Sequence, residues 1–175
     1  MPGAGSGKLK LSKVSMHGSH SNLGYGGCVD SLSGSVELDS SMLKYCTARS
    51  TGGTGGARGG AVYAGADVTL DNSVIVFSEA TSTGGQASGG AVYAKGNVVL
   101  KNESEVSDNL AEGVSARGGG IFAGGTLQVA LERSKITGNE VSATGAGGAY
   151  GGGVFVTGSA TVGLGNGIQV SGNRA

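Results

Sequence analysis

One phrase decides the fold: Gly59-Gly60-Ala61-Val62-Tyr63-Ala64 returns almost unchanged as Gly89-Gly90-Ala91-Val92-Tyr93-Ala94. Looser copies begin at Gly118 and Gly151, and a divergent copy begins at Gly26. The copies start at positions 26, 59, 89, 118 and 151, so the intervals between them are 33, 30, 29 and 33 residues. Self-similarity at such a period is typical of solenoids and repeat arrays. The whole chain is therefore predicted to be one repeat architecture.

The composition is unusual but does not indicate disorder. Glycine accounts for 38 of the 175 residues, and there is one proline and no tryptophan. Such a bias is common in low-complexity chains, but here 38% of the residues are hydrophobic and stand in short runs at matching places in each repeat. Glycine does not recur at every third position, which excludes a collagen helix.

The charge pattern excludes two classes of partner. The formal net charge is zero, only 14% of the residues are charged, and no basic stripe is apparent, so a nucleic-acid partner is not expected. No apolar run approaches the roughly 20 residues of a membrane-spanning helix, so no membrane-spanning segment is expected in this chain.

Each repeat contains three short β-type runs separated by turns. In the best copy these runs are 61–64, 68–70 and 74–77, and a variable stretch rich in Gly, Ser, Thr and Ala leads to the next glycine pair. No segment keeps a helical apolar period. The pattern predicts an all-β fold, a three-sided parallel β-helix of about five coils of ~30 residues. Its coils start near 26, 59, 89, 118 and 151 after a partial coil at 1–25, and form a single segment over 1–175. A barrel or a propeller is the rival, although a propeller blade takes about 40 residues or more.

Stacking of the coils predicts columns of equivalent side chains. One column holds asparagines that each follow an inward Val or Ile by three residues: Asn109, Asn139 and Asn173. Ser19 and Glu79 are expected at the equivalent place in other coils. Stacked asparagines can hydrogen-bond along a solenoid as they do in cross-β ladders, so this column is predicted to be structural.

A second column is predicted just after the inward leucines. It contains Asp39, Asp71, Lys101 and Glu132. Lys101 would offset the repulsion between the acids, and each such pair is worth about 0.2–1 kcal/mol. This column is also interpreted as structural.

The two motifs together resemble a known type of repeat. The Gly-Gly-Ala-Val phrase, followed later in the repeat by an apolar-x-x-Asn tetrapeptide such as 106–109, resembles the GGA[ILV] and FxxN repeats of the chlamydial polymorphic outer membrane proteins. The resemblance spans about 9–175. It implies a right-handed β-helix that is exported, often as the passenger of an autotransporter, with adhesive or structural roles at the cell surface, or at the outer membrane in a bacterium. It implies no catalytic residues.

Cys28 and Cys46 are the only cysteines, and 18 positions separate them (46 − 28). In an exported protein they could close a loop worth about 3 kcal/mol, whereas in a reducing compartment they would be small apolar core residues. Together with His17 and His20 they have irregular spacing for zinc, so no metal site is predicted, and nothing in the sequence indicates a cofactor. Asn102 begins a glycosylation sequon, Asn-Glu-Ser, which matters if a eukaryote secretes the chain.

Catalysis would require clustered carboxylates, as in β-helical polysaccharide lyases and hydrolases. Asp39 and Asp71 are expected to be adjacent, but Asp30, Asp67 and Asp108 are scattered and no set of basic residues accompanies them. No catalytic residue is predicted, and the chain is not expected to be an enzyme.

These observations favour a non-enzymatic extracellular or cell-surface scaffold or adhesin segment. A rigid rod would present variable loops at 49–58, 81–88, 111–117 and 142–150 to a protein or glycan partner. Two alternatives remain open: a subunit of a filament or larger assembly that docks through loops and uncapped ends, and a carbohydrate-active β-helix. Because the sequence begins and ends within a repeat, a segment of a longer chain or an assembly partner is expected.

Overall fold

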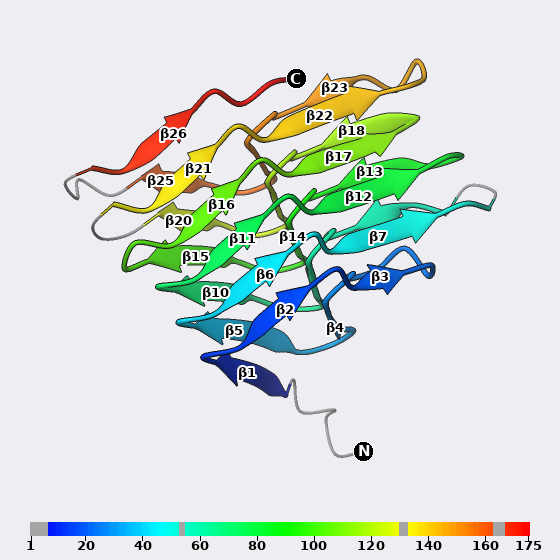
Figure 1. The fold of residues 1–175 in the computed structure, drawn as a ribbon. Helices are drawn as coiled ribbons and strands as arrows, with labels where there is room; N and C mark the ends of the chain where they lie inside the picture. Colours follow the sequence, from blue (N-terminus) through cyan, green and yellow to red (C-terminus); the bar gives the residue numbers. More distant parts are fainter. Residues whose placement is uncertain (1–6, 53–54, 130–132, 163–166) are drawn as a thin grey trace, which may run out of the picture.

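A computed structural model describes residues 7–52, 55–129, 133–162 and 167–175 (Figure 1). All the regular structure in these residues is β-strand, and every strand pairs in parallel with its equivalents in the neighbouring coils. The prediction of an all-β parallel β-helix is confirmed, since the strands stack as a solenoid of about five turns. We use "coil" for the part of the chain that begins at each glycine pair.

Three parallel sheets surround the main core. Sheet A comprises β1 (Lys8–Ser12), β5 (Ser35–Asp39), β10 (Val68–Asp71), β15 (Val98–Lys101), β20 (Leu127–Val129) and β25 (Ala160–Val162). Sheet B comprises β2 (Ser15–His17), β6 (Met42–Lys44), β11 (Val74–Val76), β16 (Glu105–Ser107), β21 (Lys135–Thr137) and β26 (Gln169–Ser171). Sheet E, formed by the repeated phrase, comprises β4 (Val29–Ser31), β9 (Val62–Ala64), β14 (Val92–Ala94), β19 (Ile121–Ala123) and β24 (Val154–Val156). These are the three runs that the sequence indicates in each repeat.

Equivalent apolar residues stack inside this core. In sheet A, Leu38 aligns with Leu70 and Leu70 with Leu100, and all three are fully buried. In sheet B the same holds for Leu43 and Ile75. Along each strand, the residues next to these inward side chains point outward, because side chains alternate between the two faces of a strand. A period of two within each run therefore separates the core from the surface.

Two further sheets form a thin arm beside the main core. Sheet C comprises β3 (His20–Ser21), β7 (Thr47–Ser50), β12 (Glu79–Ser82), β17 (Leu110–Gly113) and β22 (Glu140–Ala143). Sheet D comprises β8 (Ala57–Arg58), β13 (Gln86–Ser88), β18 (Ser115–Arg117) and β23 (Ala149–Tyr150). Figure 1 shows the pairs β12–β13, β17–β18 and β22–β23 extending side by side from the body.

The arm corrects the expectation of loops at 49–58, 81–88, 111–117 and 142–150, because each stretch begins and ends in strand, and strand makes up most of 81–88 and 111–117. The arm has its own small core, whose buried members are Ala87, Ala111, Ala116 and Val141. Alanine and glycine are poor strand formers, so the sequence resembles loop. In the structure Ala87, Ala111 and Ala116 are fully buried, so small side chains fill the space between the two sheets of the arm.

The glycine pair is needed for two different reasons. The first glycine takes a left-handed conformation, with φ +65° at Gly59 and +67° at Gly89, which L-residues with a side chain adopt at a cost. At the second position the coils approach closely. A Cβ on Gly90 would lie 2.0 Å from the carbonyl oxygen of Gly119 and 2.5 Å from the carbonyl carbon of Leu110.

We expect Gly90→Ala to destabilise the protein by about 3 kcal/mol, because the added methyl group would push backbone atoms of two neighbouring segments apart. Urea unfolding measures the effect. Gly52→Ala is the matched control, since a Cβ at Gly52 meets nothing within 4 Å, and its midpoint should stay close to that of the wild type. Equal midpoints for the two variants would contradict the close approach.

Candidate functional site

The structure joins the two cysteines in a disulfide. Cys28 Sγ and Cys46 Sγ are 2.03 Å apart, with their Cα atoms 5.5 Å apart. Cys46 is fully buried. The bond links the residue before the sheet E strand β4 to the turn between sheets B and C, so it lies where the arm meets the main core. Both thiols are used, and among the described residues no group of His, Cys, Asp and Glu is arranged to hold a metal ion.

The three predicted asparagines form a buried hydrogen-bonded column. The Asn139 Oδ1 accepts from the Asn109 backbone N–H at 3.1 Å and from Asn109 Nδ2 at 2.9 Å. Asn173 Oδ1 accepts from the same two groups of Asn139, both at 3.0 Å. The amide nitrogens also donate to main-chain carbonyls, as Asn139 does to Val106 at 3.0 Å. Each side chain thus replaces backbone pairing at a corner where the strands bend.

The column continues in earlier coils with other residues. The Ser78 N–H donates to Asn109 Oδ1 at 2.8 Å, and Cys46 N–H donates to the Ser78 hydroxyl at 3.4 Å. The expectation of Glu79 at this place is therefore wrong by one residue. Ile75 rather than Val76 points inward, so the column residue three positions later is Ser78. Glu79 lies exposed beside Leu110.

The disulfide occupies the position that the asparagine column takes in later coils. Cys46 is a member of that column, and Cys28 holds the place after the glycine pair that Gly120 holds further along the chain. There the Asn139 side chain reaches so close to Gly120 that a Cβ would lie 2.9 Å from its Cγ. A cysteine pair and an asparagine–glycine pair thus fill the same space.

The charged column also assembles in part. Asp39, Asp71 and Lys101 stand in register on the outer face of sheet A, and Lys101 Nζ lies 2.9 Å from Asp71 Oδ2. The hydrogen bond from Lys101, and then that from Asn102, lower the pKa of Asp71. Hydrogen bonds from Ser40 and Ser12 lower the pKa of Asp39. Both groups are held as carboxylates, which suits ion pairing and not proton donation. Glu132 lies outside the described residues.

The other candidate residues do not converge. Asp30 lies on β4, Asp67 accepts from the Asn97 N–H at 2.7 Å in the turn before β10, and Asp108 lies in the turn before sheet C. Asn102 is exposed, with φ +52°, and its Nδ2 donates to Asp71 at 2.7 Å. Glycosylation of Asn102 stays a prediction.

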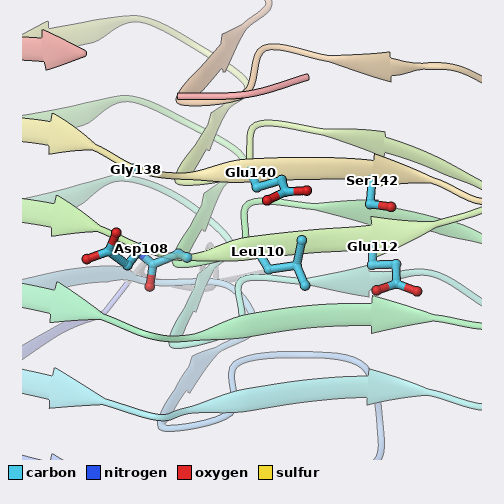
Figure 2. A pocket seen from close by; sticks show the side chains of 7 residues that line it. Asp108, Leu110, Glu112, Gly138, Glu140 and Ser142 are labelled. Carbon is cyan, nitrogen blue, oxygen red and sulfur yellow. The ribbon is translucent and has the colours of Figure 1, made fainter. Parts of the chain in front are cut away.

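A shallow pocket lies on the outer face of sheet C. Figure 2 shows Glu140 and Ser142 on one strand and Leu110 and Glu112 on the neighbouring strand, with Asp108 at the turn. No Lys, Arg or His lines this pocket. It offers carboxylates without a cation to stabilise a developing negative charge, so it does not have the set of groups that proton abstraction from a sugar acid needs.

A more distinctive surface lies where sheets D and E present their outer faces. On sheet E, one ring per coil forms a stack: Tyr63, Tyr93, Phe122 and Phe155. Successive ring centroids are 5.3, 4.7 and 5.5 Å apart, with interplanar angles of 6°, 5° and 12°. The outer column of sheet D runs in parallel through Tyr25, Arg58, Ser88, Arg117 and Tyr150. We call these two columns the aromatic–arginine face.

The arginines of this face pack on its rings. The Arg58 guanidinium carbon is 5.7 Å from the Tyr25 centroid and 5.6 Å from that of Tyr93. The guanidinium carbon of Arg117 is 5.2 Å from the Phe155 centroid and 5.9 Å from that of Tyr150. Burial within the face raises the pKa of Tyr93, an effect that the charge of Arg58 partly offsets.

Sequence reasoning missed this face. The repeat pattern alone indicates no functional role for Arg58, for Arg117 or for the rings of the repeated phrase. The signal was the regular offset between them, because in each case the arginine precedes the ring by five residues (63 − 58 and 122 − 117). Only the packing of sheet D against sheet E shows that the two columns share one surface.

No family model matches the sequence, and no curated protein and no solved structure matches it either. The class that the fold defines is a parallel β-solenoid. The resemblance to polymorphic outer membrane protein repeats stays a prediction. In the part of the chain that the structure describes, no helix could cross a membrane.

We expect Asn139→Ala to cost about 3 kcal/mol of unfolding free energy, because it leaves the Asn109 N–H and side-chain amide without their acceptor in a buried site. Asn97→Ala is the control: Asn97 also accepts a hydrogen bond from the next coil, from the Thr126 N–H at 2.9 Å, but is exposed. The unfolding free energy that Asn97→Ala loses should stay below about 1 kcal/mol. Chemical unfolding together with hydrogen exchange at the Asn109 amide measures both variants, and equal losses would argue against the buried column.

The Asp71–Lys101 pair predicts a pH dependence. The folded pKa of Asp71 lies below its ordinary value of 3.8, so the pair stabilises the fold above that pH and ceases to do so as the pH falls through the folded pKa. Lys101→Met should therefore be less stable than the wild type at pH 7, and the difference should shrink below pH 4. Unfolding curves between pH 7 and 2 test this. Lys95→Met, which removes an exposed lysine with no ion pair among the described residues, should shift stability equally at every pH.

Proposed function

We propose that this chain is a non-enzymatic scaffold segment of an extracellular or cell-surface protein that presents its outer faces to a protein or glycan partner. The observation that carries the proposal is that side chains interact mainly with their own equivalents in the next coil. Inward leucines stack on leucines, asparagines bond to asparagines, and rings stack on rings. Such an arrangement favours a stiff rod with repeated surfaces over an active site in which different side chains come together.

The disulfide supports the extracellular part of the proposal. Disulfides persist in oxidising compartments and are rare where glutathione keeps thiols reduced. The Cys28–Cys46 bond lies in the first full coil, where it ties the turn before sheet C to the start of sheet E.

The carbohydrate-active alternative has less support. Asp39 and Asp71 have lowered pKa values, so neither is suited to donate a proton near neutral pH. The pocket on sheet C carries carboxylates without a basic neighbour.

The assembly alternative has one observation in its favour. Val162 and Val170 lie in register with the buried Val129 and Ile136, yet each is 51% exposed. Apolar columns that run into solvent favour a cover by another subunit or by further coils.

Chain isolated from its source cells without reductant should show no free thiols on alkylation, and an antibody against it should label intact cells. A Cys28→Ala/Cys46→Ala variant should be less stable by about 3 kcal/mol, because the disulfide no longer restricts the unfolded chain. Thiol counting, surface labelling and thermal unfolding measure these outcomes.

The wild type with added reductant is the matched control and should unfold like the double variant. Free thiols in the isolated chain, or labelling only after lysis, would contradict the proposed compartment. Sedimentation of the same sample tests the assembly alternative, for which Val162→Ser/Val170→Ser should lower the mass.

A further inference from the structure

We propose that the aromatic–arginine face binds an acidic glycan, whose sulfate or carboxylate groups are held by Arg58 and Arg117. The inference rests on the proposed function, since it names the class of partner that the cell-surface scaffold would meet. It is argued from the positions of the two guanidinium groups, from their unused donors, and from the chemistry of the surface between them.

The two guanidinium groups are fixed before any ligand arrives. Arg58 packs on rings at 5.6 and 5.7 Å, and Arg117 packs on rings at 5.2 and 5.9 Å. Packing beside rings restricts the rotamers of both arginine side chains and provides no hydrogen-bond acceptor for their N–H groups. A planar fork held in this way binds an oxyanion bidentately with little further loss of side-chain entropy.

The donors of these arginines are unused within the protein. Among the described residues, neither arginine makes an ion pair, although Lys8, Lys10, Lys101 and Arg133 all do. The Arg117 Nε is buried and has no hydrogen-bond partner. Because the Nε is buried, a ligand oxyanion would be bound by the terminal N–H groups of the Arg117 guanidinium.

The register places the two arginines at a useful spacing. Arg58 aligns with Ser88, and Ser88 with Arg117, on three consecutive strands of sheet D. Strands lie about 4.8 Å apart, so the two arginine Cα atoms lie roughly 10 Å apart along the solenoid axis. A linear polyanion that follows this axis would meet a cation at every second coil.

The surroundings add positive charge and hydroxyl groups. Lys95 Nζ lies 6.0 Å from the Tyr63 centroid, next to the same stack. Asp30, which is in register with Tyr63, is the carboxylate of this column and lies at its first coil. The hydroxyl groups of Tyr25, Tyr93 and Tyr150 have no protein hydrogen-bond partner in the described part of the chain, so they can pair with sugar hydroxyls, whereas Tyr63 is only 3% exposed.

The same surface is poorly suited to an extended peptide. The backbone groups of sheets D and E are occupied by coil-to-coil pairing; for example, Gly59 N–H donates to Ser88 at 3.0 Å and Ala61 N–H to Ala91 at 2.9 Å. No strand edge is open along the face for a peptide strand to join. The ring faces are also covered by one another, so recognition would depend on cations and hydroxyl groups and would weaken as salt rises.

Binding of the chain to heparin and to polygalacturonate, measured by calorimetry over a salt series, tests the proposal. The sulfated and the carboxylated polymer distinguish the two sources of oxyanion. We expect one of them to bind, neutral dextran not to bind, and Arg58→Gln/Arg117→Gln to weaken the affinity more than about tenfold. Arg58→Lys/Arg117→Lys keeps the charge without the fork and should give an intermediate loss.

Arg49→Gln/Lys135→Gln is the control, since it removes two positive charges from sheets C and B and should change the affinity less than about twofold. Thermal unfolding of each variant shows whether it is folded. Binding of neither polymer, equal weakening by the control, or equal binding of single-stranded DNA would overturn the proposal. A disulfide-bonded surface protein that binds neither polymer would refute this inference alone, whereas an intracellular protein that binds heparin would refute the proposed function alone.

Discussion

Backbone hydrogen bonds between coils are the constraint on which the rest of this structure depends. Val68 N–H donates to Asn97 at 2.8 Å, and Val98 N–H donates to Thr126 at 2.8 Å, and the same step recurs around each coil. Parallel pairing without a shift in register places every residue beside its own equivalent. The nearest neighbour of a side chain is therefore the residue at the same place in the next repeat.

This constraint decides which chemistry the chain can use. Apolar residues, amides and rings can stack on copies of themselves, because an amide is both donor and acceptor and rings attract at 4.7–5.5 Å. Like charges repel, and the stacked carboxylates Asp39 and Asp71 each have a cation beside them, Lys10 and Lys101 respectively. A surface of this protein is thus a set of columns, and its properties come from which columns stand next to each other. Arg58 and Arg117 acquire their environment in this way, from rings of a different sheet.

Several features could be predicted from the sequence because they depend on local spacing. The glycine pair, the alternation in the 68–71 run and the repeat of Asn109, Asn139 and Asn173 each follow from the period of the repeat. The prediction failed where the spacing was ambiguous or the residues were small. Val74, Ile75 and Val76 are all apolar, so the inward residue was mistaken by one place and Glu79 was chosen instead of Ser78. The arm was interpreted as loops because its alanines carry little hydrophobic signal.

The sequence by itself determined that this chain is a parallel solenoid, since a repeat with a fixed number of short apolar runs allows side chains to be buried only by stacking copies. It also determined the members of the columns where the spacing is unambiguous, such as Asn109, Asn139 and Asn173. Only the tertiary structure decided how the columns are placed around the axis: that the Gly- and Ala-rich stretches pair into a two-sheet arm, that Cys28 meets Cys46 where this arm joins the main core, and that the arginines of sheet D pack on the rings of sheet E. Those contacts depend on the angles at the corners, which backbone conformation sets and which the residue types alone do not specify.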